Sequence, residues 1–84
     1  MTKHRSTVAV KVNNVAVWHF LTRKNLAQNE LANRLGISSG YMAQLIGGSR
    51  SPSPKLRRKM LSVLNPMSFD NLFLVSDRAG LDHQ

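Results

Sequence analysis

The chain of 84 residues contains no cysteine and few acidic residues, with four Asp and Glu in total. The absence of cysteine excludes disulfides and thiolate metal sites. The three histidines, His4, His19 and His83, are too scattered along the sequence to indicate a zinc site. We therefore expect no metal and no cofactor.

Carboxylates are too scarce for an enzyme. Glu30 is the only acid before Asp70, and no nucleophile-and-base spacing or phosphate-cradling glycine loop is visible. Apolar runs are short: none approaches the roughly 18 residues of a membrane span, and the N-terminus lacks the apolar core of a signal peptide. We expect a cytoplasmic protein that is not an enzyme, without membrane contact and without a small-molecule ligand.

Positive charge is what the chain has in excess. Twelve Lys and Arg against four Asp and Glu give a net charge of +8. Three of the acids, Asp70, Asp77 and Asp82, lie near the C-terminus, so the first 69 residues carry about +10. This balance is typical of proteins that bind polyanions. The alternative is a surface whose charge only keeps the protein soluble.

The most informative segment is Gln28–Leu45, which reads QNELANRLGISSGYMAQL. Gly36 stands at a break between two amphipathic stretches, where a residue free to take positive φ is needed. Ser38 can cap a second helix that begins at Ser39. The apolar residues fall where two steeply crossing helices would bury them against each other: Leu31, Ala32, Leu35, Ile37, Met42, Leu45 and Ile46. The outward residues of the second helix are uncharged and small: Ser39, Gly40, Ala43 and Gln44.

The run ELANRLGIS, followed by YMAQLIGG and RSPSP, resembles the helix-turn-helix of the Cro/CI-type (Xre-type) family of bacterial and phage regulators. The match covers Leu21 to Leu64, about half of the chain. It implies a compact, mainly α-helical DNA-binding domain of four to five helices. In this family the second helix of the pair lies in the major groove of double-stranded DNA. The resemblance thus implies a nucleoid-associated transcriptional regulator, by analogy a repressor, of phage, plasmid or mobile-element type.

Carried over position by position, the resemblance gives the base-facing candidates Ser38, Ser39, Gly40, Tyr41 and Gln44. Gln44 is preferred because an amide can form a bidentate pair with adenine. Gln28 takes the place of a phosphate contact at a helix N-terminus. The chain departs from the family pattern at Ala27, where a Ser or Thr cap is usual. It departs again at Gly40, which can contribute only backbone or close approach.

A further helix is expected before the motif. Asn13 or Asn14 can cap it, and it should end near Lys24. One face would carry Val15, Trp18 and Leu21. We expect Trp18 in the core; the alternative is an interface residue.

Another helix is expected after the motif, beyond a loop that begins where Gly47 and Gly48 close the second motif helix. The free N–H groups, the hydroxyls and Arg50 make the loop Ser49–Ser51 a candidate phosphate clamp; the alternative is an ordinary solvated connection. Ser53 and Pro54 then start a helix that runs to about Leu64. Its predicted core residues are Leu56, Met60, Val63 and Leu64. Of its bases Lys55, Arg57, Arg58 and Lys59, which lie on several faces, Lys55 is the candidate for DNA contact.

Two segments rich in strand-forming residues lie outside the helices, Thr7–Val12 and Leu72–Val75. We expect them to pair as a two-stranded ribbon, with a short helical turn at Ser68–Asn71 before the second strand. The ribbon would close the core or serve as an edge for dimer contact.

The chain is expected to form a single domain, residues 1–84, with flexible ends at 1–6 and 77–84. Lys3 and Arg5 give the first of these ends the character of a basic arm that could enter the minor groove. A disordered polar terminus is the alternative.

Two other functions remain open on the same fold. One is an antitoxin-like or other protein-binding module, and the other is an architectural or excisionase-type DNA-binding accessory protein. The expected partner of a regulator is double-stranded DNA. A homodimer, formed in solution or only on DNA, would have to use the C-terminal ribbon or Trp18 and its neighbours, because the chain has no coiled-coil heptads.

Overall fold

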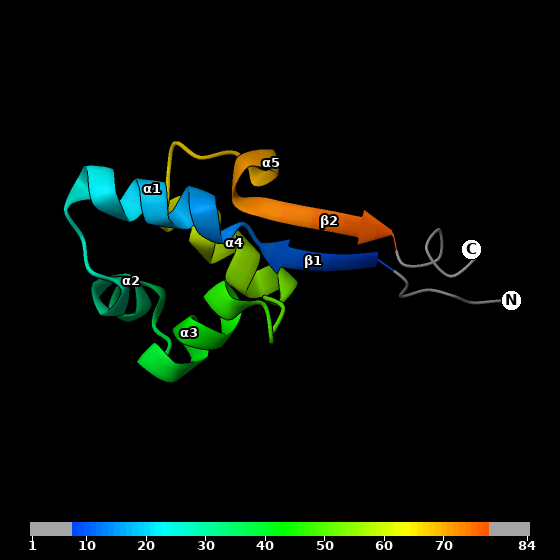
Figure 1. The fold of residues 1–84 in the computed structure, drawn as a ribbon, viewed down its shortest axis with the longest axis horizontal. Coiled ribbons are helices and arrows are strands. Elements are labelled where there is room, and N and C mark those ends of the chain that lie inside the picture. The colour runs from blue at the N-terminus through cyan, green and yellow to red at the C-terminus, as the bar shows by residue number, and fades with distance from the viewer. Residues whose placement is uncertain (1–7, 78–84) are drawn as a thin grey trace, which may run out of the picture.

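A computed structural model describes residues 8–77 of the chain. Within this range the protein is a small, mainly helical body with one two-stranded sheet, as expected from the sequence (Figure 1). The elements in chain order are β1 (Val8–Val12), α1 (Asn14–Lys24), α2 (Gln28–Leu35), α3 (Ser39–Gly47), α4 (Pro54–Val63), α5 (Phe69–Leu72) and β2 (Phe73–Asp77).

Side-chain caps set where three of the four longer helices begin. The Asn13 side chain accepts a hydrogen bond from the Ala16 N–H at 3.3 Å and starts α1. Ser38 Oγ accepts from the Tyr41 N–H at 3.0 Å and starts α3. Ser53 caps α4 in the same way, with Pro54 at the first helical position. Each cap satisfies an N–H that the helix itself cannot pair, and all three starts predicted from the sequence are confirmed.

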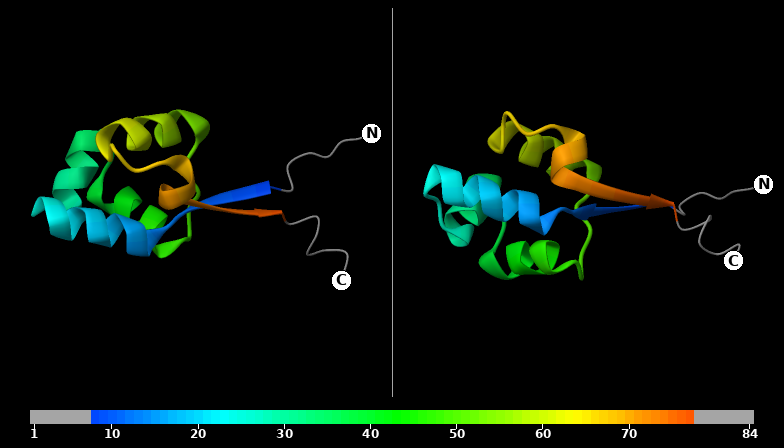
Figure 2. Two further views of the ribbon diagram at one scale, coloured as in Figure 1. Left: turned by 90° about the horizontal axis from the view of Figure 1, so that it is seen from above. Right: turned by 45° about the horizontal axis from the view of Figure 1, so that its top comes forward.

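The predicted ribbon is also present. β1 and β2 are antiparallel, with Val12 opposite Phe73 and Val8 opposite Asp77. The strand begins at Phe73 rather than Leu72, because Leu72 completes α5 and is buried there. The Val12–Phe73 end is buried and closes the core, while the other end extends away from the helices (Figures 1 and 2).

The core is formed where α1 to α5 meet the inner end of the ribbon. The apolar residues predicted for the two motif helices are buried, with Ile37 half-buried at the turn. In α4 the core residues are Leu56 and Met60, followed by Leu64, and Val63 is half-buried. No helix within residues 8–77 combines the length and apolar character needed to cross a membrane.

The prediction that Trp18 lies in the core is wrong. Trp18 is 49% exposed and Val15 is 54% exposed, whereas Val17, Phe20 and Leu21 form the buried face of α1. Three-residue steps fall about 60° short of a full helical turn. Positions 15 and 18 lie about 160° and 100° from position 17 around the helix, so the predicted face and the buried face share only Leu21. Trp18 remains available for the alternative interpretation, an interface residue.

Candidate functional site

Helices α2 and α3 follow each other across a short turn at Gly36, as the sequence predicts. Gly36 takes φ +73°, so the residue at the turn does adopt the left-handed backbone. The Ile37 N–H donates to the Ala32 carbonyl at 3.0 Å and closes the end of α2. Ser38, two residues after Gly36, caps α3. The turn is therefore short, and each of its ends makes a hydrogen bond to the adjoining helix.

Helix α3 separates an apolar face from a small polar one. Met42, Leu45 and Ile46 are buried against the body. Its exposed residues are Ser39, Gly40, Ala43, Gln44 and Gly47, to which the exposed cap Ser38 adds its hydroxyl. Tyr41 is half-buried at the margin. The base-facing candidates thus lie together on α3 and its cap, exposed except for Tyr41, and none of them carries a charge.

Glycine at position 40 has no use in the packing of the protein. A Cβ built at Gly40 would have no atom within 4 Å, and the same holds for Gly47. Gly40, Ala43 and Gly47 recur at helical spacing and share one face of α3. A glycine inside a helix costs about 0.5–1 kcal/mol relative to alanine. The glycines of this face therefore lower helix stability and do not improve the internal packing of the protein.

The loop after α3 brings a cation to this face. The Arg50 guanidinium lies over the Tyr41 ring, 5.6 Å from its centroid. The N–H groups of Ser49 and Arg50 both donate to the Gln44 carbonyl, at 3.1 and 3.3 Å. The expectation that these two N–H groups are free is therefore wrong, since they complete the turn that ends α3. The Ser49 hydroxyl donates to the same carbonyl at 3.4 Å, and the Arg50 side chain is the charged group of the candidate clamp.

The start of α2 differs from the usual capped helix, as predicted. Ala27 has no side-chain acceptor, but its N–H donates to Glu30 Oε1 at 2.8 Å. Glu30 thus acts as a structural residue at this helix end. Gln28 is half-buried beside it. An anion approaching Gln28 would share the helix N-terminus with the Glu30 carboxylate, which weakens this position as a phosphate site.

A hollow of about 230 Å³ opens between α3 and the start of α4. Its floor is apolar, and Lys55, Lys59 and Tyr41 contribute to its lining. A Cβ at Gly36 would lie 3.3 Å from Lys59 Nζ, so this lysine reaches the α2–α3 turn. Lys55 was predicted near this site and Lys59 was missed, although their four-residue spacing on one helix places them on the same face. Arg57 instead donates to the Pro52 carbonyl at 3.0 Å.

The other end of α3 is held from a distance in the sequence. Lys11 Nζ donates to the Gly48 carbonyl at 2.9 Å, and Asn14 Nδ2 donates to the Ile46 carbonyl at 3.4 Å. Sequence reasoning did not single out Lys11 or assign this role to Asn14. No local signal could have found either contact, because each joins residues more than 30 positions apart.

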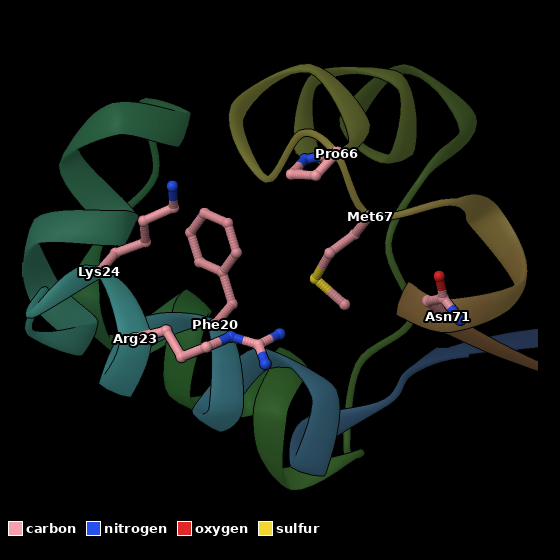
Figure 3. Close-up of a pocket in the computed structure, with 6 residues that line it drawn as sticks. All are labelled: Phe20, Arg23, Lys24, Pro66, Met67 and Asn71. Carbon is pink, nitrogen blue, oxygen red and sulfur yellow. The ribbon is translucent and has the colours of Figure 1, made fainter.

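Another hollow, of about 390 Å³, lies away from α3 (Figure 3). It is formed between α1 and the segment that links α4 to α5, and is lined by Phe20, Arg23, Lys24, Pro66, Met67 and Asn71. None of the predicted site residues lines it. Lys3 and Arg5, the candidates for a minor-groove arm, lie outside the described residues. Within residues 8–77 no group of three or more His, Asp or Glu side chains is placed to hold a metal ion.

The structure thus brings Ser38, Ser39, Gly40, Tyr41, Gln44 and Arg50 together around α3, with Lys55 and Lys59 beside them. No family model, curated protein or solved structure matches the chain. The likeness to the Cro/CI-type family accordingly depends on the sequence motif alone.

Proposed function

We propose that the protein is a sequence-specific regulator of transcription that binds double-stranded DNA through α3, as the Cro/CI-type resemblance implies. The observation that carries the proposal is the exposed face of α3, which is uncharged and contains glycine where the fold does not require it. A solvated helix face has no need of such residues. A helix that enters the major groove has to approach base edges closely.

Charge around α3 supports the same proposal. Arg50 follows α3, and Lys55 and Lys59 line the hollow beside its start. Cations on the margins of an uncharged helix face are what a groove-binding surface requires, because phosphates flank the base edges on both sides. Each phosphate neutralised releases counterions, so binding should weaken steeply as salt rises.

Within this proposal Gln44 is the principal residue for base recognition. It is exposed near the middle of α3, one turn after Gly40. Its amide can donate one hydrogen bond to adenine and accept another. An alanine side chain can make neither bond. Ser38 and Ser39 would contact bases or the adjacent backbone at the entry of the helix, and Gly40 would allow the approach.

A second copy of the chain is the proposed protein partner, in solution or only on DNA. The ribbon leaves Val8, Leu74 and Val75 more than half exposed. Lys11 and Asp77 are its only charged residues, so the ribbon is close to neutral in a chain of net charge +8. Two highly basic copies of the chain repel each other least when they meet through their nearly neutral ribbons.

The role of repressor, rather than activator, and the nucleoid location both follow from the family resemblance. Two other proposals lead to different results in a binding experiment. An architectural DNA-binding protein binds with strong salt dependence but without sequence preference. A protein-binding module on the same fold does not bind DNA.

Selection of bound sequences from a randomised DNA pool at about 150 mM salt tests the proposal. We expect one enriched motif, and the size of the complex on that sequence will give the number of chains bound. Salt-sensitive binding without enrichment would favour the architectural function. Absence of binding would favour the protein-binding module.

A further inference from the structure

Lys11 connects the β-ribbon to the end of the helix proposed to enter DNA. It lies in β1, is half-buried, and its Nζ donates to the carbonyl of Gly48 at 2.9 Å. Gly48 is the residue that ends α3, with φ +87°. Two residues earlier, the Ile46 carbonyl accepts from Asn14 Nδ2 at the start of α1. The C-terminus of α3 is therefore held by two side chains from the N-terminal part of the domain.

Helix α3 supplies no cation of its own at this end. The carbonyl end of a helix carries partial negative charge and is stabilised by a nearby cation. Helix α1 has Arg23 and Lys24 in its last turn, and α2 has Arg34. The last turn of α3 has no basic residue. Lys11 provides the missing charge from another element.

We propose that Lys11 is a positioning residue, which fixes the direction of α3 on the domain and does not bind phosphate. The inference rests on the proposed function, since it concerns how α3 is presented to DNA. A charged hydrogen bond to a half-buried carbonyl would be lost if the ammonium turned to a phosphate, and Gly48 would be left without this partner. Among the basic residues of the chain, Lys11 is thus assigned to internal structure.

Positioning and phosphate binding differ in what they do to sequence discrimination and to salt dependence. Loss of a phosphate contact weakens binding to all DNA and lowers the magnitude of the salt slope by about one. Loss of a positioning contact misaligns α3 with base edges, so it weakens binding to the preferred sequence and leaves the number of phosphate contacts unchanged.

The test compares Lys11→Met, Lys11→Arg and Arg50→Ala on the selected sequence and on random DNA across a salt series. We expect Lys11→Met to bind the selected sequence about tenfold more weakly, with little change on random DNA and with the wild-type salt slope. Lys11→Arg keeps a charged donor and should bind like the wild type. Equal losses on both DNAs with a reduced slope, as expected for Arg50→Ala, would overturn the proposal.

The hydrogen bond from Lys11 to the Gly48 carbonyl acts as a tether for α3. Amide hydrogen exchange without DNA tests this tether separately from the proposed function. The N–H groups of Gly48 and Ser49 are bonded to carbonyls of the last turn of α3. They should exchange faster in Lys11→Met than in the wild type, and unchanged exchange would overturn the tether. If Lys11→Met does not fold, Lys11→Gln carries the same two expectations, because it also removes the charge that reaches the Gly48 carbonyl. Failure of the wild type to bind DNA would reject the proposed function, whereas the exchange result would still decide the tether.

Discussion

The guanidinium of Arg50 lies over the ring of Tyr41, with 5.6 Å between the guanidinium carbon and the ring centroid. Tyr41 belongs to the first turns of α3, and Arg50 belongs to the loop that follows that helix. The stacking therefore folds the loop back along α3 and holds a permanent charge beside the face proposed to contact bases.

Arg50→Ala should weaken binding to every DNA sequence and lower the magnitude of the salt slope by about one, because one phosphate contact is lost. Arg50→Lys keeps the charge and should retain the slope. Arg23→Ala is the matched control: it also removes one arginine, but from the hollow between α1 and the α4–α5 link. The measurement is the affinity at several salt concentrations. If the affinity of Arg50→Ala depends on salt as steeply as that of the wild type, Arg50 does not bind a phosphate.

Gln44→Ala should cost about 1–3 kcal/mol of binding free energy on the preferred sequence and almost nothing on random DNA. The Gln44 side chain is exposed, so the free energy of unfolding should change little. Only its backbone carbonyl takes part in the turn after α3, and alanine keeps that carbonyl. Competition binding with the two DNAs measures the difference. An equal loss on random DNA would remove Gln44 from base recognition.

Ala27→Ser should raise the free energy of unfolding by about 1 kcal/mol. Ala27 already has the extended backbone of a cap residue, φ −85° and ψ 157°, and its N–H is bonded to Glu30. A serine hydroxyl would add the missing acceptor and complete the reciprocal capping box. The gain is measured by urea denaturation, as a higher midpoint with an unchanged dependence of the unfolding free energy on urea concentration. Ser53→Ala, which removes an existing cap from α4, should lower the free energy of unfolding by a similar amount.

The local signals in the sequence were sufficient to predict the helices, because each signal acts on residues only a few positions away. Ser38, Ser53 and Gly36 act within a few positions of themselves, and all three behave as predicted. The ribbon was also predictable, since both segments are rich in strand-forming residues and neither would be stable alone.

What the sequence did not reveal depends on packing between distant segments. The buried side of α1 was misplaced at Trp18, because packing between α1 and distant elements such as α5 decides which of its apolar residues are buried. The contact of Lys11 with Gly48 spans 37 positions. The N–H groups of Ser49 and Arg50 were assumed to be free because the path of the loop over α3 could not be inferred from its composition.

The central claim is that α3 carries a small residue at Gly40 in order to approach DNA. Gly40→Ala separates fold from function, because a Cβ at this position meets no atom of the protein within 4 Å. The substitution should raise the free energy of unfolding by about 0.5–1 kcal/mol. Thr22→Ala, on the exposed side of α1, is a control that raises helix propensity away from α3.

The most direct measurement is the affinity of Gly40→Ala for the selected DNA sequence, taken together with its free energy of unfolding. We expect a protein that is more stable than the wild type and binds the selected sequence more weakly, while Thr22→Ala binds like the wild type. A Gly40→Ala protein that is more stable and binds the selected sequence with unchanged affinity would contradict the claim that this face of α3 contacts the bases.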